Sequence, residues 1–485
     1  MNKNINEHTV RVAQSAKALA SDLPLSEHQS LLPKRTPEQV IALALLGASI
    51  VVFLVHFLFF RHSFPPTNTD ESSFFSPALS FATKGNLASD IHKSFLPGAG
   101  TYTYWMPPLY ILVLGCFLKV FGTTVMAAKV LSLLLTCGSA LLLASLARSR
   151  YGKASVAALF LICPFIIITS AFVRVEALAI FLTLLAIVAV RRERSDWLLG
   201  VIAALGVMTH PLMLACAAGL GLTSLRRGFK PLLLFALGFA IAISPYIWYI
   251  LQDLTLFKEQ MALQFLRKEK AKLFDLKAMY LLQSVPMALL ALFCLYKTKA
   301  QNELRLFLTV SIILALLIVL KSNEFNYQVY LVPYTLAAVM LAMEQRSDTS
   351  LFRWATPLML FGIFGVMLLS KLVKYKFRSD ADFKQLEAQL DAVPAWKGKS
   401  IFVSGGPDVS THLLMNGEKV EREVPVPQSL PKTLFDKYNY VIEVRANGEE
   451  NVYEEAGKPH PWRTWKASAF TTADSAYTMT QYIKE

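Results

Sequence analysis

The sequence has few charged residues: Asp, Glu, Lys and Arg make up 17% of its 485 positions. Soluble globular proteins contain about 25% of these residues, so an ordinary soluble domain is excluded. Hydrophobic residues make up 54%, and many separate apolar stretches approach the ~20 residues that cross a bilayer core. We therefore predict an all-α polytopic membrane protein, because a membrane β-barrel would show alternating segments of roughly ten residues instead.

The sequence also lacks the common signatures of soluble enzymes. It contains no P-loop, no dinucleotide-binding fingerprint and no Ser-His-Asp arrangement. The five cysteines lie in apolar segments without metal-ligand spacing, so we interpret them as small buried hydrophobic residues and predict no metal site. No convincing internal repeat of the kind found in many transporters is visible.

The net charge of +14 comes from Lys and Arg residues spread over short loops between apolar segments. This distribution is the topology signal of a membrane protein and argues against nucleic-acid binding. Every second loop is basic, and these loops, with Lys34 and Arg35, mark the cytoplasmic side. The N-terminus is therefore inside, and an odd number of spans places the C-terminus outside. These loops are Arg148–Lys153, Arg191–Arg194, Arg226–Lys230, Lys297–Arg305 and Arg346–Arg353.

The apolar pattern predicts about eleven spans, and this count requires that Pro107–Gly122 does not cross the membrane. That segment is apolar but short and opens with two prolines, so we expect a juxtamembrane or half-inserted helix on the outer side. If it crossed, the charge rule would fail at every later loop. The predicted spans are 39–60, 123–147, 153–171, 175–191, 196–210, 211–225, 230–250, 276–296, 304–320, 327–343 and 353–371.

Three parts of the chain follow from this topology. Residues 1–36 form a polar cytoplasmic tail without the pattern of a cleaved signal. Residues 37–371 form the transmembrane domain, whose first outer loop covers 61–122. Residues 372–485 turn polar and carry strand-like runs at Ser400–Ser404 and Tyr438–Val444, so we predict a small mixed α/β domain outside the cytoplasm.

An acidic pair, Asp70-Glu71, follows the first span by ten residues. The next segment, Phe74–Gly85, reads as a short helix on the membrane surface that ends at Gly85. The pair can be a solvated loop pair or a helix N-cap. Alternatively, an ionised carboxylate there can take a proton from an acceptor, which is worth roughly 10²–10⁴ in rate.

The motifs that follow the acidic pair are recognisable by their order. After a Lys-Gly turn come Pro107-Pro108-Leu109-Tyr110, Phe121-Gly122 and a span that ends in a basic turn. The order resembles the GT-C superfamily of integral-membrane glycosyltransferases, in the branch of protein O-mannosyltransferases and lipid A aminoarabinose transferases. The resemblance covers roughly residues 37–345 and implies that the acidic loop faces outside, with Asp70 as the catalytic base.

Two later segments extend the resemblance. Arg174-Val175-Glu176 is similar to the family's Arg-Pro-Asp/Glu element, and Asn326–Pro333 is similar to its tyrosine-rich start of a late span. The sequence departs from the aminoarabinose branch at Trp105 and Met106, where that branch has an acidic residue and a Lys before Pro-Pro. Because that Lys helps to hold a lipid phosphate, the departure argues against that particular substrate.

We assign site residues from these motifs and from the topology, and for some of them a purely structural role is also possible. Arg174 and Glu176 can form an interfacial ion pair that reaches water. The basic segment Gln252–Asp275 can be a solvated surface helix, and His210 a structural residue. The predicted roles are catalytic for Asp70 and Glu71, donor phosphate binding for Arg174, Lys268, Lys270 and His210, and substrate binding for Glu176, Tyr104, Tyr110, Tyr327 and Tyr330.

The resemblance implies transfer of a hexosyl or pentosyl group from a polyprenyl-phosphate donor, and we expect this transfer to occur with inversion at the outer face of the membrane. The acceptor is a glycolipid, polysaccharide or protein, and the charge on the phosphate is stabilised by an Arg/Lys clamp or a divalent cation. The short loops favour a bacterial inner membrane with the site on the periplasmic side. The alternatives are a transporter or lipid flippase, and a non-catalytic relative that acts as a binding or assembly subunit.

Overall fold

A computed structural model of the chain describes most of the predicted transmembrane domain and parts of the C-terminal region. The predicted N-terminal tail 1–36, most of the predicted span 353–371, and the predicted site residues Asp70 and Lys270 lie outside the described residues. The described residues are 37–60, 71–93, 96–269, 278–298, 301–322, 325–345, 362–365, 388–390, 399–404, 413, 419–422, 440–446, 466–471 and 477–483.

The described part of residues 37–345 is almost wholly helical, as predicted. Its helices are α2 (Pro37–Phe60), α3 (Glu71–Lys84), η1 (Asp90–His92), α4 (Leu109–Phe121), α5 (Val125–Ser145), α6 (Arg150–Ile162), α7 (Pro164–Ala171), α8 (Glu176–Arg191), α9 (Asp196–Thr209), η2 (Pro211–Met213), α10 (Leu214–Arg227), α11 (Phe229–Leu251), α12 (Leu254–Glu269), α13 (Ala278–Lys297), α14 (Asn302–Ser322), η3 (Phe325–Leu331) and α15 (Val332–Gln345).

Among the described residues, four helices are long and apolar enough to cross a membrane by length and composition: α2, α5, α11 and α14. The chain is therefore an integral membrane protein. The predicted span 153–171 is not one straight helix, because α6 and α7 meet at an angle of 64°. Pro164 lacks an N–H group and opens α7, so the break falls where proline ends one helix and begins another. The full number of spans remains a prediction.

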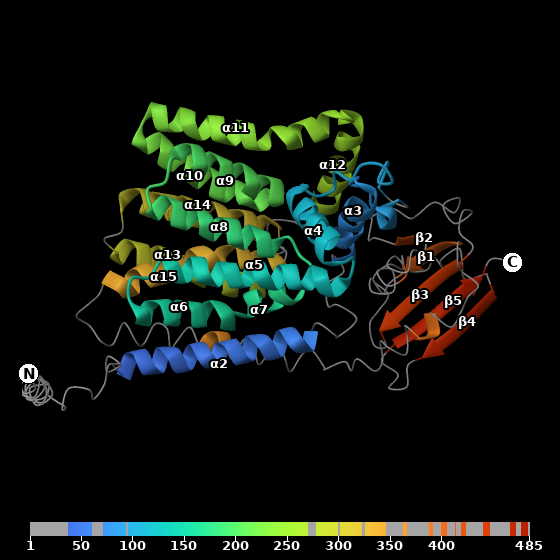
Figure 1. The fold of residues 1–485 in the computed structure, drawn as a ribbon, viewed down its shortest axis with the longest axis horizontal. Coiled ribbons are helices and arrows are strands. Elements are labelled where there is room, and N and C mark those ends of the chain that lie inside the picture. The colour runs from blue at the N-terminus through green and yellow to red at the C-terminus, as the bar shows by residue number, and fades with distance from the viewer. Residues whose placement is uncertain are drawn as a thin grey trace, which may run out of the picture.

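The long helices lie side by side, and their axes are roughly aligned across the bundle (Figure 1). The turns that follow α5, α8, α10 and α13, which carry the basic residues, lie at one end of the bundle. The short helices α3, α4 and α12 lie at the opposite end. This arrangement agrees with the alternation of basic loops in the sequence.

The two short helices α3 and α4 pack against each other beside the end of the bundle. A Cβ at Gly115 would lie 2.7 Å from the Phe81 ring, so the two helices touch closely. As predicted, α3 ends at Gly85, whose φ is +75°. Helix α4 has 13 residues. At 1.5 Å per residue it is about 20 Å long, shorter than the ~30 Å core of a bilayer.

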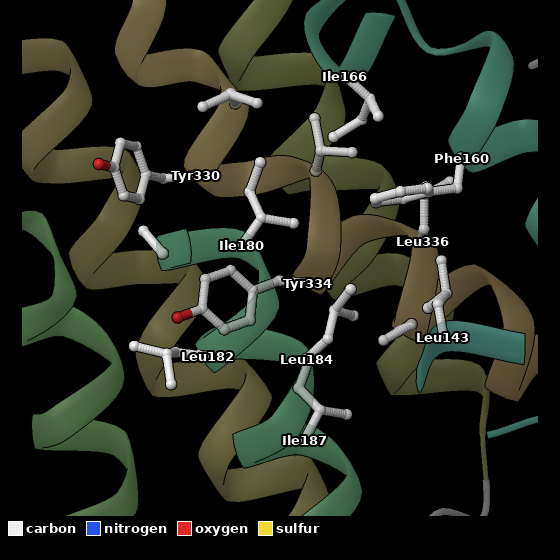
Figure 2. Close-up of a cluster of buried hydrophobic side chains, with 14 of the residues drawn as sticks. Leu143, Phe160, Ile166, Ile180, Leu182, Leu184, Ile187, Tyr330, Tyr334 and Leu336 are labelled. Carbon is white, nitrogen blue, oxygen red and sulfur yellow. The ribbon is translucent and has the colours of Figure 1, made fainter. Parts of the chain in front are cut away.

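Helix α8 lies at the centre of the bundle, and its residues are apolar and buried nearly all round, as expected of a core helix. It packs among α5, α9, α14 and α15. Figure 2 shows Ile180, Leu184 and Ile187 of α8 among buried side chains that include Tyr334 and Leu336 of α15. The N-terminal residue of α8 is Glu176, so the most deeply packed helix positions a charged side chain.

Two glycines allow α9 and α11 to cross in direct backbone contact. A Cβ at Gly200 would lie 2.0 Å from the carbonyl oxygen of Phe235, and a Cβ at Gly238 would lie 2.2 Å from that of Trp197. Small residues at helix crossings are typical of membrane proteins, where close van der Waals packing drives helix association. This contact fixes α11, which leads into α12 at the end of the bundle that carries α3 and α4.

The described C-terminal strands form one mixed sheet of order β2-β1-β3-β5-β4. Strand β1 is parallel to β2 and β3, and β5 is antiparallel to β3 and β4. The predicted strands at 400–404 and 438–444 correspond to β1 and β3, whereas the sequence did not reveal the other three. Strand β2 contacts η1 of the first loop. The bounds are β1 (Ser400–Ser404), β2 (Lys419–Arg422), β3 (Tyr440–Ala446), β4 (Lys466–Thr471) and β5 (Tyr477–Ile483).

We predict that Gly200→Ala destabilises the protein although alanine favours helices. Its methyl group would meet the Phe235 carbonyl oxygen at 2.0 Å, and overpacking of this kind costs about 1–3 kcal/mol. Thermal unfolding in detergent measures the effect. The matched control is Gly221→Ala on α10, where the new Cβ only touches the Phe235 ring at 3.5 Å. An equal decrease in the melting temperature of both variants would contradict the close contact between α9 and α11.

Candidate functional site

Four charged side chains are buried together where α3, α5 and α8 meet. Glu71 opens α3, Lys129 lies near the start of α5, and Arg174 and Glu176 lie at the junction of α7 and α8. Their exposed fractions are 6%, 1%, 5% and 1%. Charged groups are almost never buried to this extent unless they are paired, and in membrane proteins they mark functional sites.

Glu71 is tied to the segment that precedes α8. Its Oε1 accepts a hydrogen bond of 2.7 Å from the backbone N–H of Val173. Burial raises the pKa of the Glu71 carboxyl, while the charge of Lys129, the Val173 hydrogen bond and the charge of Arg174 oppose the rise. Glu71 therefore holds α3 against the α7–α8 junction, and its ionised form depends on the neighbouring positive charges.

Arg174 and Glu176 form a two-point ion pair. Nε of Arg174 donates to Oε2 of Glu176 at 3.0 Å, and Nη2 donates to Oε1 at 2.5 Å. The sequence suggested that such a pair would lie at the interface and reach water, but the structure places it in the interior. Since two guanidinium nitrogens are engaged with Glu176, the pair presents much less net positive charge than a lone arginine.

Two tyrosine hydroxyl groups lie near this ion pair. Tyr110 on α4 is fully buried and Tyr330 on η3 is 4% exposed, and both phenols lie within electrostatic range of Arg174 and Glu176. Burial raises the pKa of Tyr110 well above its usual range, so this hydroxyl stays protonated and can donate a hydrogen bond. Within the described residues the Tyr330 hydroxyl has no hydrogen-bond partner, whereas Ser132 interacts with the hydroxyl of Tyr110.

His210 reaches the same region from the junction of α9 and η2. Its ring lies 5.3 Å from the ring of Tyr327 and 5.2 Å from that of Tyr330. The Nδ1 atom accepts a hydrogen bond of 3.2 Å from the backbone N–H of Leu212. Because Nδ1 accepts, the geometry assigns the tautomer with the proton on Nε2, which makes Nε2 a donor.

Tyr104, predicted to join these residues, lies in a different cluster. Its hydroxyl donates to the Tyr249 carbonyl at 3.1 Å, and its ring lies 4.8 Å from the Tyr249 ring and 5.7 Å from the Phe257 ring. Burial, together with the charge of Asp253, raises the pKa of Tyr104. The structure thus assigns Tyr104 to the contact between the first outer loop and the helices α11 and α12.

A buried glutamine of α12 fastens the first outer loop. Gln260 is fully buried, accepts from the Tyr104 N–H at 2.7 Å, and donates to the carbonyl oxygens of Pro97 and Tyr102 at 2.7 and 3.0 Å. Trp105 is buried against the loop, and its carbonyl accepts from Gln264 at 2.9 Å. These contacts explain how an apolar Trp105 replaces a charged residue before Pro-Pro: it packs the loop onto α12.

The structure brings together Glu71, Arg174, Glu176, Tyr110, Tyr327, Tyr330 and His210, all of which the sequence singled out. The backbone of α12 includes Lys268, whose side chain lies outside the described part of the chain, as do Asp70 and Lys270. The sequence analysis missed Lys129, although a lysine inside an apolar run is a recognisable signal. It also missed Gln328, because only the structure shows that this amide is fully buried.

Several buried polar atoms without hydrogen bonds lie at this end of the bundle. Such atoms in the described residues lie on α3, on the loop before α4 and on η3, and others lie on α2, α6, α8, α13 and α14. An unsatisfied buried polar atom is costly, so a group of them is typical of a site that a ligand or water fills. No group of three or more His, Cys, Asp or Glu residues that could hold a metal occurs among the described residues. The unsatisfied side chains at this end are Ser76, Thr103, Gln328 and Tyr330.

The arrangement of the bundle, its two short helices and the C-terminal mixed sheet is similar to that of solved ArnT structures. The particular similarity is to the crystal structure of ArnT from Cupriavidus metallidurans bound to undecaprenyl phosphate. The TM-score is 0.55 at 12% sequence identity, and the alignment covers 90% of this chain and 97% of that chain. The apo form of the same protein aligns with a TM-score of 0.54 at 12% identity, over 91% of this chain and 98% of that chain.

This similarity is one of fold. No family model matches the sequence, and no curated protein matches it either. The predicted resemblance to the GT-C architecture is therefore confirmed in three dimensions, at a level of sequence identity that does not transfer residue roles. The roles of the individual residues follow from the contacts described above.

We predict that Lys129→Met makes stability more sensitive to pH. The substitution removes the positive charge that most favours ionised Glu71, so the pKa of Glu71 rises further above the ~4.3 of an exposed glutamate. The folded state then binds more protons than the unfolded state, and stability is lost as the pH rises through the folded-state pKa. Thermal unfolding from about pH 5 to about pH 8 measures the slope.

The control for this prediction is the double variant Lys129→Met/Glu71→Gln. The glutamine cannot ionise, but its amide oxygen can still accept from the Val173 N–H. The double variant should therefore lose the added pH dependence. If the melting temperatures of the wild type and Lys129→Met change with pH in the same way, the charges of Lys129 and Glu71 are not coupled.

We predict that a single substitution at the buried ion pair lowers the free energy of unfolding more than substitution of both partners. Arg174→Met leaves Glu176 as a buried carboxylate without its two-point partner, and breaking such a pair costs about 3–5 kcal/mol. Arg174→Met/Glu176→Leu removes both charges and should recover most of the loss. Chemical unfolding of the wild type, both single variants and the double variant gives the coupling energy. Additive effects would contradict the pairing.

Proposed function

We propose that the protein is a glycosyltransferase that uses a polyprenyl-phosphate sugar donor. The observation that carries the proposal is the cluster of buried charges and unsatisfied hydroxyl groups at one end of a GT-C bundle. In the similar fold of ArnT, the crystal structure contains undecaprenyl phosphate. A lipid phosphate needs both an apolar surface for its tail and fixed hydrogen-bond donors for its headgroup, and this bundle offers both.

The proposed donor phosphate lies beside the Arg174–Glu176 pair. The hydroxyl groups of Tyr110 and Tyr330 and the Nε2–H of His210 are neutral donors that can point at its oxygens. Lys129 and Arg174 supply the positive charge, partly balanced by the two glutamates. Lys268 and Lys270, at the end of α12 and beyond it, add charge that attracts phosphate near a membrane surface. Tyr327 contributes through its contact with His210.

Asp70 is the proposed catalytic base, with Glu71 beside it in the chain. The acceptor oxygen bonds to the anomeric carbon while the bond from that carbon to the phosphate oxygen breaks, with inversion at the carbon. The acceptor proton passes to Asp70, and the electron pair of the broken bond stays on the phosphate. Glu71, the next residue in the chain, holds the start of α3 against the α7–α8 junction through the Val173 hydrogen bond.

The location of the reaction follows from the charge pattern. The basic loops lie at the end of the bundle opposite α3, α4 and α12, which supports our proposal of a site on the outer, periplasmic side because basic loops favour the cytoplasmic side. The parts 1–36, 37–371 and 372–485 are then the inner tail, the catalytic domain and an outer domain that helps to hold a glycolipid, glycan or protein acceptor. A divalent cation near the phosphate would be an additional source of positive charge.

We predict that Asp70→Asn abolishes sugar transfer. Membranes that contain equal amounts of wild type or variant are supplied with radiolabelled polyprenyl-phosphate sugars, and labelled acceptor is measured. Loss of a general base lowers the rate by roughly 10²–10⁴. Undecaprenyl phosphate should still stabilise the variant against heating, since the base does not hold the phosphate.

The matched control is Asp90→Asn on the same loop. Asp90 lies at the surface in ion pairs with Lys84 and Lys93, and hydrogen bonds from Lys93 and Lys84 hold its pKa below the usual range although burial opposes this. Surface pairs contribute about 0–1 kcal/mol, so transfer should change little. Equal transfer by wild type and Asp70→Asn would remove the base assignment and favour a transporter or a binding subunit.

A further inference from the structure

Gln328 on η3 is a buried amide whose polar atoms are both unsatisfied. Its side chain is fully buried, and neither Oε1 nor Nε2 has a hydrogen-bond partner in the part of the chain that the structure describes. It lies in the same short helix as Tyr327 and Tyr330, whose rings contact His210. A glutamine that served only to hold the fold would be bonded on at least one side.

We propose that Gln328, together with the Tyr330 hydroxyl, forms a subsite for the ring hydroxyl groups of a neutral sugar. The inference deepens the proposed function and rests on it. A primary amide offers a donor and an acceptor side by side, which matches a hydroxyl that both accepts and donates. The 3₁₀ helix has three residues per turn, so Tyr330 shares a face with Tyr327, and Gln328 leaves the helix on the adjacent face, about 120° away. A sugar ring that spans these two faces contacts both Gln328 and Tyr330.

The charges of the described site favour a neutral sugar over an amino sugar. A protonated amino sugar would need a carboxylate of its own, and the proposed base Asp70 takes the acceptor proton instead. The two buried carboxylates that the structure describes at this site are engaged: Glu176 with Arg174, and Glu71 with the Val173 N–H. The unsatisfied groups of η3 are an amide and a phenol, which carry no charge. Neutral groups of this kind bind hydroxyls without the desolvation cost of an ion.

The proposed subsite on η3 allows the protein to distinguish the sugar-bearing lipid from the sugar-free polyprenyl phosphate. The hydroxyl groups and charges near Arg174 suit the phosphate, which a sugar-free polyprenyl phosphate also has. Only the sugar-bearing lipid brings hydroxyl groups to Gln328. A subsite of this kind therefore makes the protein bind the loaded donor more tightly than the spent carrier, because an unpaired buried amide disfavours the empty complex.

The test compares two lipids on detergent-solubilised full-length protein: undecaprenyl phosphate and undecaprenyl-phosphate hexose. Wild type should bind the hexose lipid more tightly, by roughly fivefold for each hydrogen bond made by the sugar. Gln328→Leu should remove this preference and leave the affinity for undecaprenyl phosphate unchanged. Gln328→Glu should shift the preference toward an amino-sugar lipid, since it supplies the missing carboxylate.

Stability provides a second, independent readout. Gln328→Leu replaces an unsatisfied amide by an apolar side chain of similar volume, so the melting temperature should stay the same or rise. The matched control is Gln260→Leu, which removes an equally buried amide that makes three hydrogen bonds, and should lower the melting temperature. A lower melting temperature for Gln328→Leu with an unchanged lipid preference would overturn the subsite and assign Gln328 to the fold.

Three other results would also overturn the subsite. If Gln328→Leu weakens both lipids equally, the amide contacts the phosphate and not the sugar. If wild type binds neither lipid, the proposed function itself fails and the sugar assignment fails with it. Binding of undecaprenyl phosphate without any preference for the hexose form would retain the proposed function and remove only the sugar subsite.

Discussion

The burial of four charges at one end of an apolar bundle is the constraint on which the rest of the site depends. Arg174 and Glu176 form an ion pair, and the positive charges of Lys129 and Arg174 oppose the rise that burial causes in the pKa of Glu71. The Val173 hydrogen bond to Glu71 fixes the start of α3 against the segment that leads into α8. Helix α4, which packs on α3, then carries Tyr110 into the same place.

The surrounding fold supplies the rigidity that such a cluster needs. Helix α8 is buried on nearly all sides, so Glu176 at its first position cannot move far without disturbing the core. The glycine contact between α9 and α11 fixes the helix that leads to α12. Catalytic groups act best when their supporting shell holds them in place, and here that shell is made of spans far apart in the sequence.

The sequence predicted much of this arrangement because membrane helices leave strong signals. Hydropathy located the helices, Gly85 marked the end of α3, and motif order pointed to Arg174, Glu176 and Tyr330. Other features needed three dimensions. The sequence did not reveal the bend at Pro164, because proline also begins ordinary helices. The contacts of Tyr104 with α11 and α12 join segments far apart in the sequence, so only the structure shows them. The empty hydrogen-bonding capacity of Gln328 leaves no trace in sequence.

The bonds that Gln260 makes to residues 97–104 join segments more than 150 positions apart into one mechanical unit. Helix α12 and the loop before α4 must therefore move together or not at all. The loop that leads into the helix of Tyr110 is thereby held by a helix from a distant part of the sequence, so a change that displaces α12 also disturbs the position of that tyrosine.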